Sequence, residues 1–238
     1  MFEVSTKDKI KYCLRRDNLK ELKKLHLEHP GLLHFVTDTY CGYHEYTIHA
    51  AARKGAIKCL TYLLDKGVNP NVPGNISEEY PIHMAISGGH YDAMCLLLER
   101  GAKANSKTCV DHTPLIEVAC SRLDEDLKIK MAEKLIEYGA NPMAFGMFRK
   151  GKYGTKKAGN GFFEEPGIGL SVVYIAQYKG EKKLEKFFRQ ERAKWKYNHS
   201  IKGRVLKGLS ILGQLIPKSE KQNPNSPKKL LKTPQNER

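Results

Sequence analysis

The sequence predicts an all-α repeat solenoid, built from helix-turn-helix units with short β-hairpin fingers and followed by a basic, partly disordered C-terminal tail. The main observation is that two stretches of the chain match one another at a constant offset. Three pairs of matching residues are each 34 positions apart: His49 and His83, Gly55 and Gly89, Gly67 and Gly101. Three landmarks that keep one offset indicate an internal repeat. A second observation is that the net positive charge lies entirely behind residue 143.

Each copy of the repeat predicts two helices joined by a tight turn. Pro81 stands at a first helical position, where its missing N–H costs nothing. Gly55 fits the turn between the helices, because a positive φ is inexpensive only for glycine. The run Leu96–Leu98 supplies the apolar stripe of a second helix, and Gly101 predicts a left-handed cap at its end.

A third copy opens at Thr113-Pro114-Leu115 and closes at Gly139-Ala140-Asn141. Together with the first two copies it resembles the ankyrin repeat, whose signature is Thr-Pro-Leu-His-x-Ala-Ala with a closing Gly-Ala-Asp/Asn. The resemblance covers residues 5–194. It is strong over residues 45–141 and weak on either side of them. It implies stacked helix pairs, structural rather than catalytic roles for His49 and His83, and a protein-binding surface.

The third copy departs from the pattern in two ways. Ile116 stands where histidine is expected, and its distance to the closing glycine is 23 residues instead of 18. The sequence therefore predicts about five inserted residues, near Leu123–Lys128, in the turn between its two helices.

The repeat period divides residues 1–195 into about five units. They are 5–35 as an N-terminal cap, 45–74, 79–108, 112–142 and 170–195 as a C-terminal cap. Phe35–His44 is expected to form the first hairpin, and a Gly/Lys-rich loop at 143–169 interrupts the array. In the first unit, Leu19, Leu22, Leu25 and Leu27 are expected to line the second helix. In the last unit, Tyr174 takes the histidine position.

The formal net charge of +15 lies entirely behind the third unit. Residues 1–143 contain 19 Lys+Arg and 19 Asp+Glu, whereas residues 144–238 contain 22 and 7. A neutral array with a basic appendage is therefore expected. Residues 196–216 predict an amphipathic helix that packs on the array, lies on an anionic membrane or enters a partner's groove. Residues 217–238 are rich in Pro, Asn and Lys and predict disorder.

The resemblance places partner contacts at the hairpin tips and at the exposed end of each first helix. In this sequence those positions are Tyr43, Glu45, Arg53, Lys54, Ser77, Glu79, Ser87, Val110, His112 and Ser121. We expect the partner to be a protein, and the chain itself to be a monomer.

A second hypothesis assigns binding to the tail. Its basic residues would contact an anionic membrane or the phosphates of a nucleic acid, and such binding weakens steeply with salt. The tail residues proposed for these contacts are Lys202, Arg204, Lys207, Lys228 and Lys229.

No catalytic, metal or cofactor site is predicted. We find no nucleophile–base pair or carboxylate pair whose spacing the repeat does not already explain. His26, His29 and His34 are close in sequence, but no cysteine or carboxylate completes a metal ligand set. Gly146–Tyr153 nearly matches a phosphate-binding loop, but it lacks the final Ser or Thr and a preceding strand.

The six cysteines form no Cys-x-x-Cys pair and predict free thiols in a reducing compartment, the cytoplasm. The first residues lack the apolar segment of a secretory signal. Lys228–Lys232 resembles a weak nuclear signal, which leaves the nucleus as an alternative. Short ankyrin arrays with polar tails also resemble effectors that intracellular bacteria deliver into host cells, which leaves the host-cell cytoplasm as another.

Overall fold

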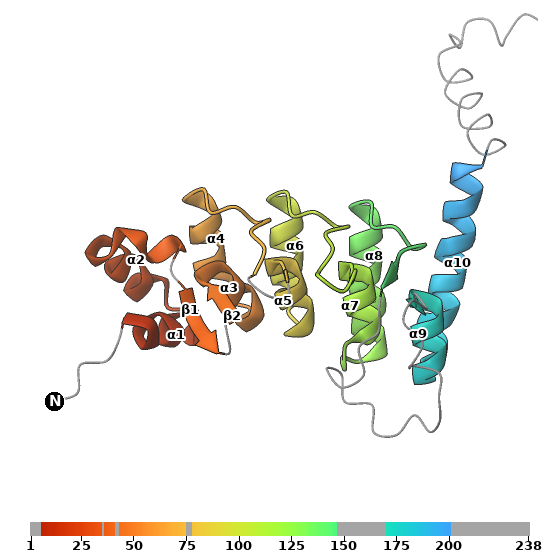
Figure 1. Cartoon of the computed structure of the whole chain (residues 1–238), viewed down its shortest axis with the longest axis horizontal. Helices are drawn as coiled ribbons and strands as arrows, with labels where there is room; N and C mark the ends of the chain where they lie inside the picture. Colours follow the sequence, from red (N-terminus) through yellow and green to blue (C-terminus); the bar gives the residue numbers. More distant parts are fainter. Residues whose placement is uncertain (1–5, 35, 41–42, 75–77, 147–169, 201–238) are drawn as a thin grey trace, which may run out of the picture. The chain divides into compact units, whose positions relative to one another are not determined.

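The computed structural model describes residues 6–34, 36–40, 43–74, 78–146 and 170–200, and most of them form pairs of helices (Figure 1). The pairs are α1 (Thr6–Arg16) with α2 (Leu19–Glu28), α3 (Thr47–Lys54) with α4 (Ile57–Asp65), α5 (Pro81–Ser87) with α6 (Tyr91–Glu99), α7 (Pro114–Cys120) with α8 (Glu125–Glu137), and α9 (Val172–Lys179) with α10 (Lys182–His199). A 3-10 helix, Pro30–His34, follows α2. The chain divides into two compact units, Met1–Arg192 and Ala193–Arg238.

Within the first unit the helices stack in two rows, as expected for a repeat solenoid. The inner row runs α1, α3, α5, α7, α9, and each helix contacts the next. The outer row runs α2, α4, α6, α8 with the same neighbour contacts. The all-α repeat fold predicted from the 34-residue offset is therefore confirmed.

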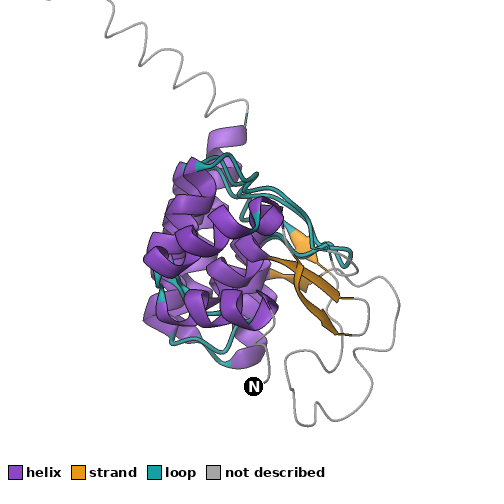
Figure 2. Ribbon diagram, turned by 90° about the vertical axis from the view of Figure 1, so that its left-hand side faces the viewer, coloured by secondary structure: helices purple, strands orange, loops and turns teal. Residues whose placement is uncertain are grey.

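Two short antiparallel strand pairs and the long loops lie on one side of the helices (Figure 2). The first pair is β1 (Val36–Tyr40) with β2 (Tyr43–Tyr46), where the sequence predicted a hairpin. The second is β3 (Phe145–Gly146) with β4 (Leu170–Ser171), which joins the third unit to the last. This side is called the hairpin side below.

Small residues allow the inner helices to pack closely. Ala51, Ala52 and Ala85 are fully buried where α3 meets α5. Gly55 ends α3 with φ +63°, and a Cβ there would lie only 2.4 Å from Nδ1 of His90 in the next unit. Glycine is therefore required at this turn both for its backbone conformation and for the space that His90 occupies.

Buried histidines join neighbouring units through hydrogen bonds to loop carbonyls. Nε2 of His49 donates to the carbonyl of Glu79 at 3.0 Å, and Nε2 of His83 donates to the carbonyl of His112 at 3.2 Å. In His83 the other ring nitrogen accepts from the backbone N–H of Tyr80. Each ring is therefore a neutral imidazole. Burial lowers the pKa of both His49 and His83 to about 4.

Asparagines join the same units on the loops that follow the outer helices. Nδ2 of Asn71 donates to the carbonyl of Gly101, and its Oδ1 accepts from the N–H of Lys103, both at 2.8 Å. Asn105 makes the same two bonds one unit later, to Gly139 and Asn141. The sequence analysis missed this pair, although Asn71 and Asn105 share the 34-residue offset.

The insertion in the third unit was assigned to the wrong element. Helix α8 contains 13 residues, against 9 in α4 and in α6, so most of the extra residues extend the helix. Asp124 caps α8 by accepting from the N–H of Asp126, and Glu125 and Asp126 occupy its first turn. An acidic run that suggested a loop is a helix N-terminus, where negative charge is stabilising.

Two residues that the sequence placed correctly in their helices are exposed. Leu27 is 85% exposed, because it lies two residues after the buried Leu25 and therefore on the opposite face of α2. Tyr174 is 40% exposed in the position where His49 and His83 are buried. Its helix is the last of the inner row in the described chain, so no later loop there accepts a bond.

The buried histidines predict that the protein loses stability in acid. Their folded pKa of about 4 lies below the ordinary 6.5, so between these values the unfolded chain binds more protons and stability falls as pH falls. We expect a loss of up to about 3 kcal/mol per histidine from pH 7 to pH 4, at about 1.4 kcal/mol per pKa unit. The free energy of unfolding, measured with urea between pH 7 and pH 4, checks this expectation.

The matched variant for this measurement is His49→Gln with His83→Gln, since the glutamine amide can still donate to the loop carbonyl. Its free energy of unfolding should fall less steeply with acid than that of the parent protein. Parallel pH profiles for the two proteins would contradict the assignment.

Candidate protein-binding face

The residues predicted to contact a partner fall into three groups in the structure. One group is exposed on the hairpin side or at the ends of the inner helices. A second is buried in contacts that hold the units together. A third lies where the structure gives no description of the side chain.

Four of the predicted residues are at least partly exposed. Arg53 and Lys54 form the last turn of α3, and Ser87 ends α5. Val110, in the loop before α7, is half-exposed. The ends of successive inner helices therefore present polar side chains along one face, as the sequence analysis proposed.

Two buried residues correct the expected contact surface near the hairpins. Glu45 is 3% exposed, since its carboxylate accepts from Nη2 of Arg53 at 2.6 Å. Glu79 is 8% exposed, and its backbone carbonyl accepts from both His49 and the N–H of Gly74. Both belong to the structure of the array rather than to its free surface.

Two further corrections concern the third unit. His112 is 4% exposed, with Nδ1 3.8 Å from a carboxylate oxygen of the buried Glu117. Ser121 is 5% exposed, and its hydroxyl donates to the carbonyl of Val118 at 2.8 Å. Ser121, which occupies the position of the exposed Lys54, is thus buried at the end of α7.

Several predicted contacts lie outside the described residues. These are Ser77, the side chain of Tyr43, and the tail residues Lys202, Arg204, Lys207, Lys228 and Lys229. Their proposed roles stay predictions.

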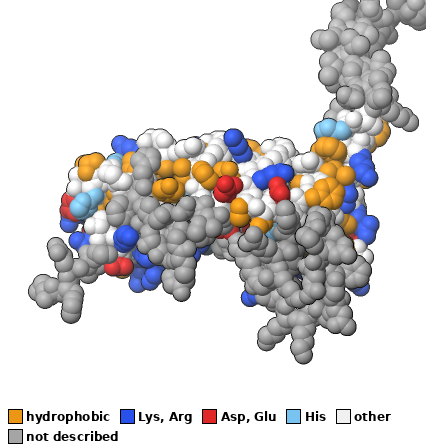
Figure 3. All heavy atoms as spheres, in the orientation of Figure 1, with side chains coloured by type: hydrophobic (Ala, Val, Ile, Leu, Met, Phe, Trp, Pro, Cys, Tyr) orange, Lys and Arg blue, Asp and Glu red, His pale blue; other side chains and the backbone are white. Residues whose placement is uncertain are grey.

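A hollow on the inner row lies between α1 and α3. It encloses about 200 Å³ and is lined by Lys11, Leu14, Arg15, Glu45, Ala50, Arg53 and Lys54. A second hollow of about 570 Å³ adjoins it along α1 and is lined by Asp8, Lys9, Lys11, Tyr12, Arg15, Asn18 and Glu21. The two share Lys11 and Arg15, and we call them together the α1–α3 hollow. Figure 3 shows Lys and Arg side chains gathered over α1.

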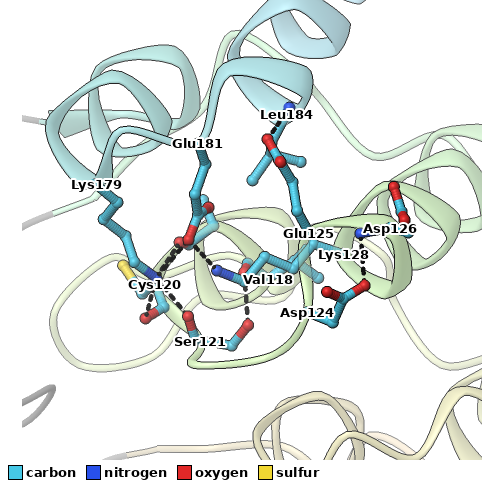
Figure 4. Close-up of polar contacts among 11 residues, drawn as sticks. Val118, Cys120, Ser121, Asp124, Glu125, Asp126, Lys128, Lys179, Glu181 and Leu184 are labelled. Atoms are coloured by element: carbon cyan, nitrogen blue, oxygen red, sulfur yellow. Dashed lines mark hydrogen bonds and ion pairs between the residues drawn. The ribbon is translucent and has the colours of Figure 1, made fainter.

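The opposite end of the array contains a buried cluster of charges that is structural (Figure 4). Lys128 is fully buried, and its ammonium lies 2.6 Å from Glu181. The ammonium of Lys179 lies 3.3 Å from the same carboxylate oxygen. Burial and, to a smaller extent, the adjacent Lys179 lower the pKa of Lys128 to about 8 against the opposing effect of Glu181.

Lys179 also closes the end of α7. Its ammonium donates to the carbonyls of Ala119, Cys120 and Ser121, which have no partner inside the helix. A cation at a helix C-terminus is favoured by the helix dipole as well. The cluster therefore fixes the turn after α7 against the turn before α10, and Ser121 is held within it.

The first turn of α8 completes this junction. Glu125 accepts from the backbone N–H of Leu184 at 2.8 Å, and Asp126 lies 2.9 Å from the ammonium of Lys183. The acidic run 124–126 thus meets the beginning of α10 through Glu125 and Asp126. The sequence analysis had no signal for this contact, because the partners are almost 60 residues apart.

Two buried cysteines are held in the thiol form. Burial raises the pKa of the Cys59 thiol, and that of Cys120 to about 12, so both stay protonated at neutral pH. Among the described residues, no group of three or more His, Cys, Asp or Glu side chains is placed to hold a metal ion. None of the helices described has the length and apolar character needed to cross a membrane.

Comparison with known families gives one match. A family model described as ankyrin repeats (many copies) matches residues 48–98, which cover most of α3 to α6. No curated protein matches the sequence.

The charge cluster predicts that removing one of its charges destabilises the protein more than removing a matched pair. Glu181→Gln leaves the Lys128 ammonium buried without its counter-charge, so we expect a loss of about 3 kcal/mol in the free energy of unfolding. Lys128→Met with Glu181→Gln should recover part of that loss, because neither charge is then buried unpaired. Urea unfolding at pH 7, followed by circular dichroism, checks both values.

The control is Glu137→Gln, which removes the partner of Lys134 in a surface pair with an N–O distance of 2.9 Å. Because exposed pairs contribute little, its effect should stay within about 0.5 kcal/mol. Equal losses for Glu181→Gln and Glu137→Gln would show that the buried cluster is not stabilised in this way.

Proposed function

We propose that this chain, an ankyrin-repeat protein, is a non-catalytic scaffold that binds a protein partner through the inner helices and the hairpin side of its array. Ankyrin repeats are generally protein–protein interaction modules, and stacked repeats offer an extended binding surface. The proposal concerns which surface is used and which residues are available on it.

The observation that carries the proposal is a division among the polar groups of the array. Those that face a neighbouring unit are used in holding it, as with His49, His83 and Asn71. Those at the ends of α3 and α5 are exposed, and they follow one another along one face. A row of accessible side chains on a rigid support is suited to recognising an extended part of a partner.

An alternative proposal is association with an anionic membrane or a nucleic acid through the tail. The supporting observation is the charge of residues 144–238, which contain 22 Lys+Arg and 7 Asp+Glu. Binding of this kind would be lost when residues 201–238 are removed and would weaken steeply with salt. The cytoplasmic location, and delivery into a host cell as an effector, likewise stay proposals from the sequence.

Capture of the partner provides the test. Tagged full-length protein and a chain ending at Ser200 should capture the same protein, because the proposed face lies within the array. Ser87→Arg places a large charged side chain on that face and should reduce capture about tenfold or more, as expected for a residue near the centre of an interface. Quantitative mass spectrometry of the captured protein measures it.

The control is Leu27→Arg, which makes the same kind of change at a position that is 85% exposed on the outer helix α2. Capture should then be unchanged. Loss of capture on removal of 201–238, with no effect of Ser87→Arg, would favour the tail and contradict the proposed face.

A further inference from the structure

The positive charge of the inner row is concentrated at one end of the array. Helix α1 carries Lys7, Lys9, Lys11, Arg15 and Arg16 against Asp8. Helix α3 adds Arg53 and Lys54 and has no acidic residue. Helix α5 carries no Lys, Arg, Asp or Glu, and α7 carries Glu117 alone. Helices α1 and α3 together therefore carry seven Lys and Arg against one Asp, although residues 1–48 as a whole are close to neutral, with 8 Lys+Arg and 7 Asp+Glu.

Helix stability does not account for this arrangement. Cations in the last turn of a helix complement its dipole, which would suffice for Arg15, Arg53 and Lys54. Helices α5 and α7, however, end without any basic residue and pack in the same row. Lys9 and Lys11, moreover, lie before the last turn of α1. The cations are therefore not required by the repeat.

The basic side chains converge on the α1–α3 hollow. Lys11, Arg15, Arg53 and Lys54 all line its inner part, and Lys9 lines its outer part. Among the described residues, Arg15 and Lys54 have no ion-pair partner, and both side chains are exposed. They are available to a negatively charged group from outside.

Arg53 is oriented in advance for such a group. Its Nη2 is held at 2.6 Å by Glu45, whose carboxylate is buried, while 43% of the Arg53 side chain is exposed. A guanidinium has five N–H donors, so donors are left over after the bond to Glu45. A fixed guanidinium loses less entropy on binding a carboxylate than a mobile side chain does.

We propose that the α1–α3 hollow binds an acidic segment of the protein partner, with Arg15, Arg53 and Lys54 contacting its carboxylates. The exposed apolar surface in the lining comes from Tyr12, which is 57% exposed, while Leu14 and Ala50 are buried. The lining also includes Asp8, Glu21 and Glu45, so the cations outnumber the carboxylates but are not alone. Several separate cations beside an exposed tyrosine fit a polypeptide that carries Asp or Glu next to an apolar residue, more than they fit an inorganic anion. The inference rests on the proposed function and names the chemistry of the partner.

Binding of a defined peptide to the full-length protein tests the proposal. The probe is a short fluorescein-labelled peptide rich in Asp and Glu with one Leu, and its reference is the same peptide with Asn and Gln instead. Fluorescence anisotropy at physiological salt should show binding of the acidic peptide only. Arg15→Gln with Lys54→Gln should weaken it about tenfold or more, because charge-assisted bonds are lost.

The matched control is Lys20→Gln with Lys24→Gln, which removes the same charge from exposed positions on α2. It should change the affinity less than about threefold, as expected for a distant surface charge. Equal weakening by both pairs of substitutions, or none by either, would overturn the proposal, and so would absence of acidic-peptide binding.

Two further outcomes are decisive. Equal binding of the Asn/Gln peptide would show that carboxylates are not what the hollow recognises. Displacement of the acidic peptide by inorganic phosphate, but not by sodium chloride of equal ionic strength, would assign the hollow to a phosphate group instead. If partner capture still depends on Ser87 in either case, the acidic-segment proposal fails while the scaffold function stands.

Discussion

The structure depends on one constraint: no unit can cover its own apolar face, so each is held by its neighbour. The carbonyl of Glu79 receives a second bond from His49 in the preceding unit, beside that from Gly74, and the carbonyl of His112 receives one from His83. Because the donor imidazoles are buried and neutral, each bond forms in a dry environment where an unpaired carbonyl would be costly. Adjacent units therefore fold as a cooperating set, with stability that comes mainly from the interfaces between them.

This constraint sorts the polar residues into those that hold the array and those that remain at its surface. Glu45 shows how one position serves both purposes, since its buried carboxylate fixes an arginine whose remaining donors face outward. At the other end, Glu181 pairs with both Lys128 and Lys179, and these charges attach the last unit. The two ends of the array thus use the same kinds of side chain for opposite purposes.

Features that recur with the repeat period could be predicted from the sequence. Burial and contacts between residues far apart in the sequence could not. The 34-residue offset located the helix pairs and the glycine turns, because each turn needs the same backbone conformation. It could not show that Glu45, Glu79 and His112, which occupy one repeat position, are all buried, so they were assigned to the surface. The contact between Lys128 and Glu181 spans 53 residues and has no local signature. The acidic residues before Lys128 were misread, because a capped helix start and a polar loop share the same composition.

A surface built from copies of one unit has an inherent ambiguity, since a partner that fits one unit could also bind one unit further along. Helices α1 and α3 carry seven of the eight Lys and Arg of the inner row, α5 and α7 carry none, and Lys179 of α9 is used in the buried cluster, which removes that ambiguity. A ligand with matching charge has a single favourable register and a single direction along the stack. Because the charge is uneven along an otherwise periodic face, a partner can bind that face at only one position.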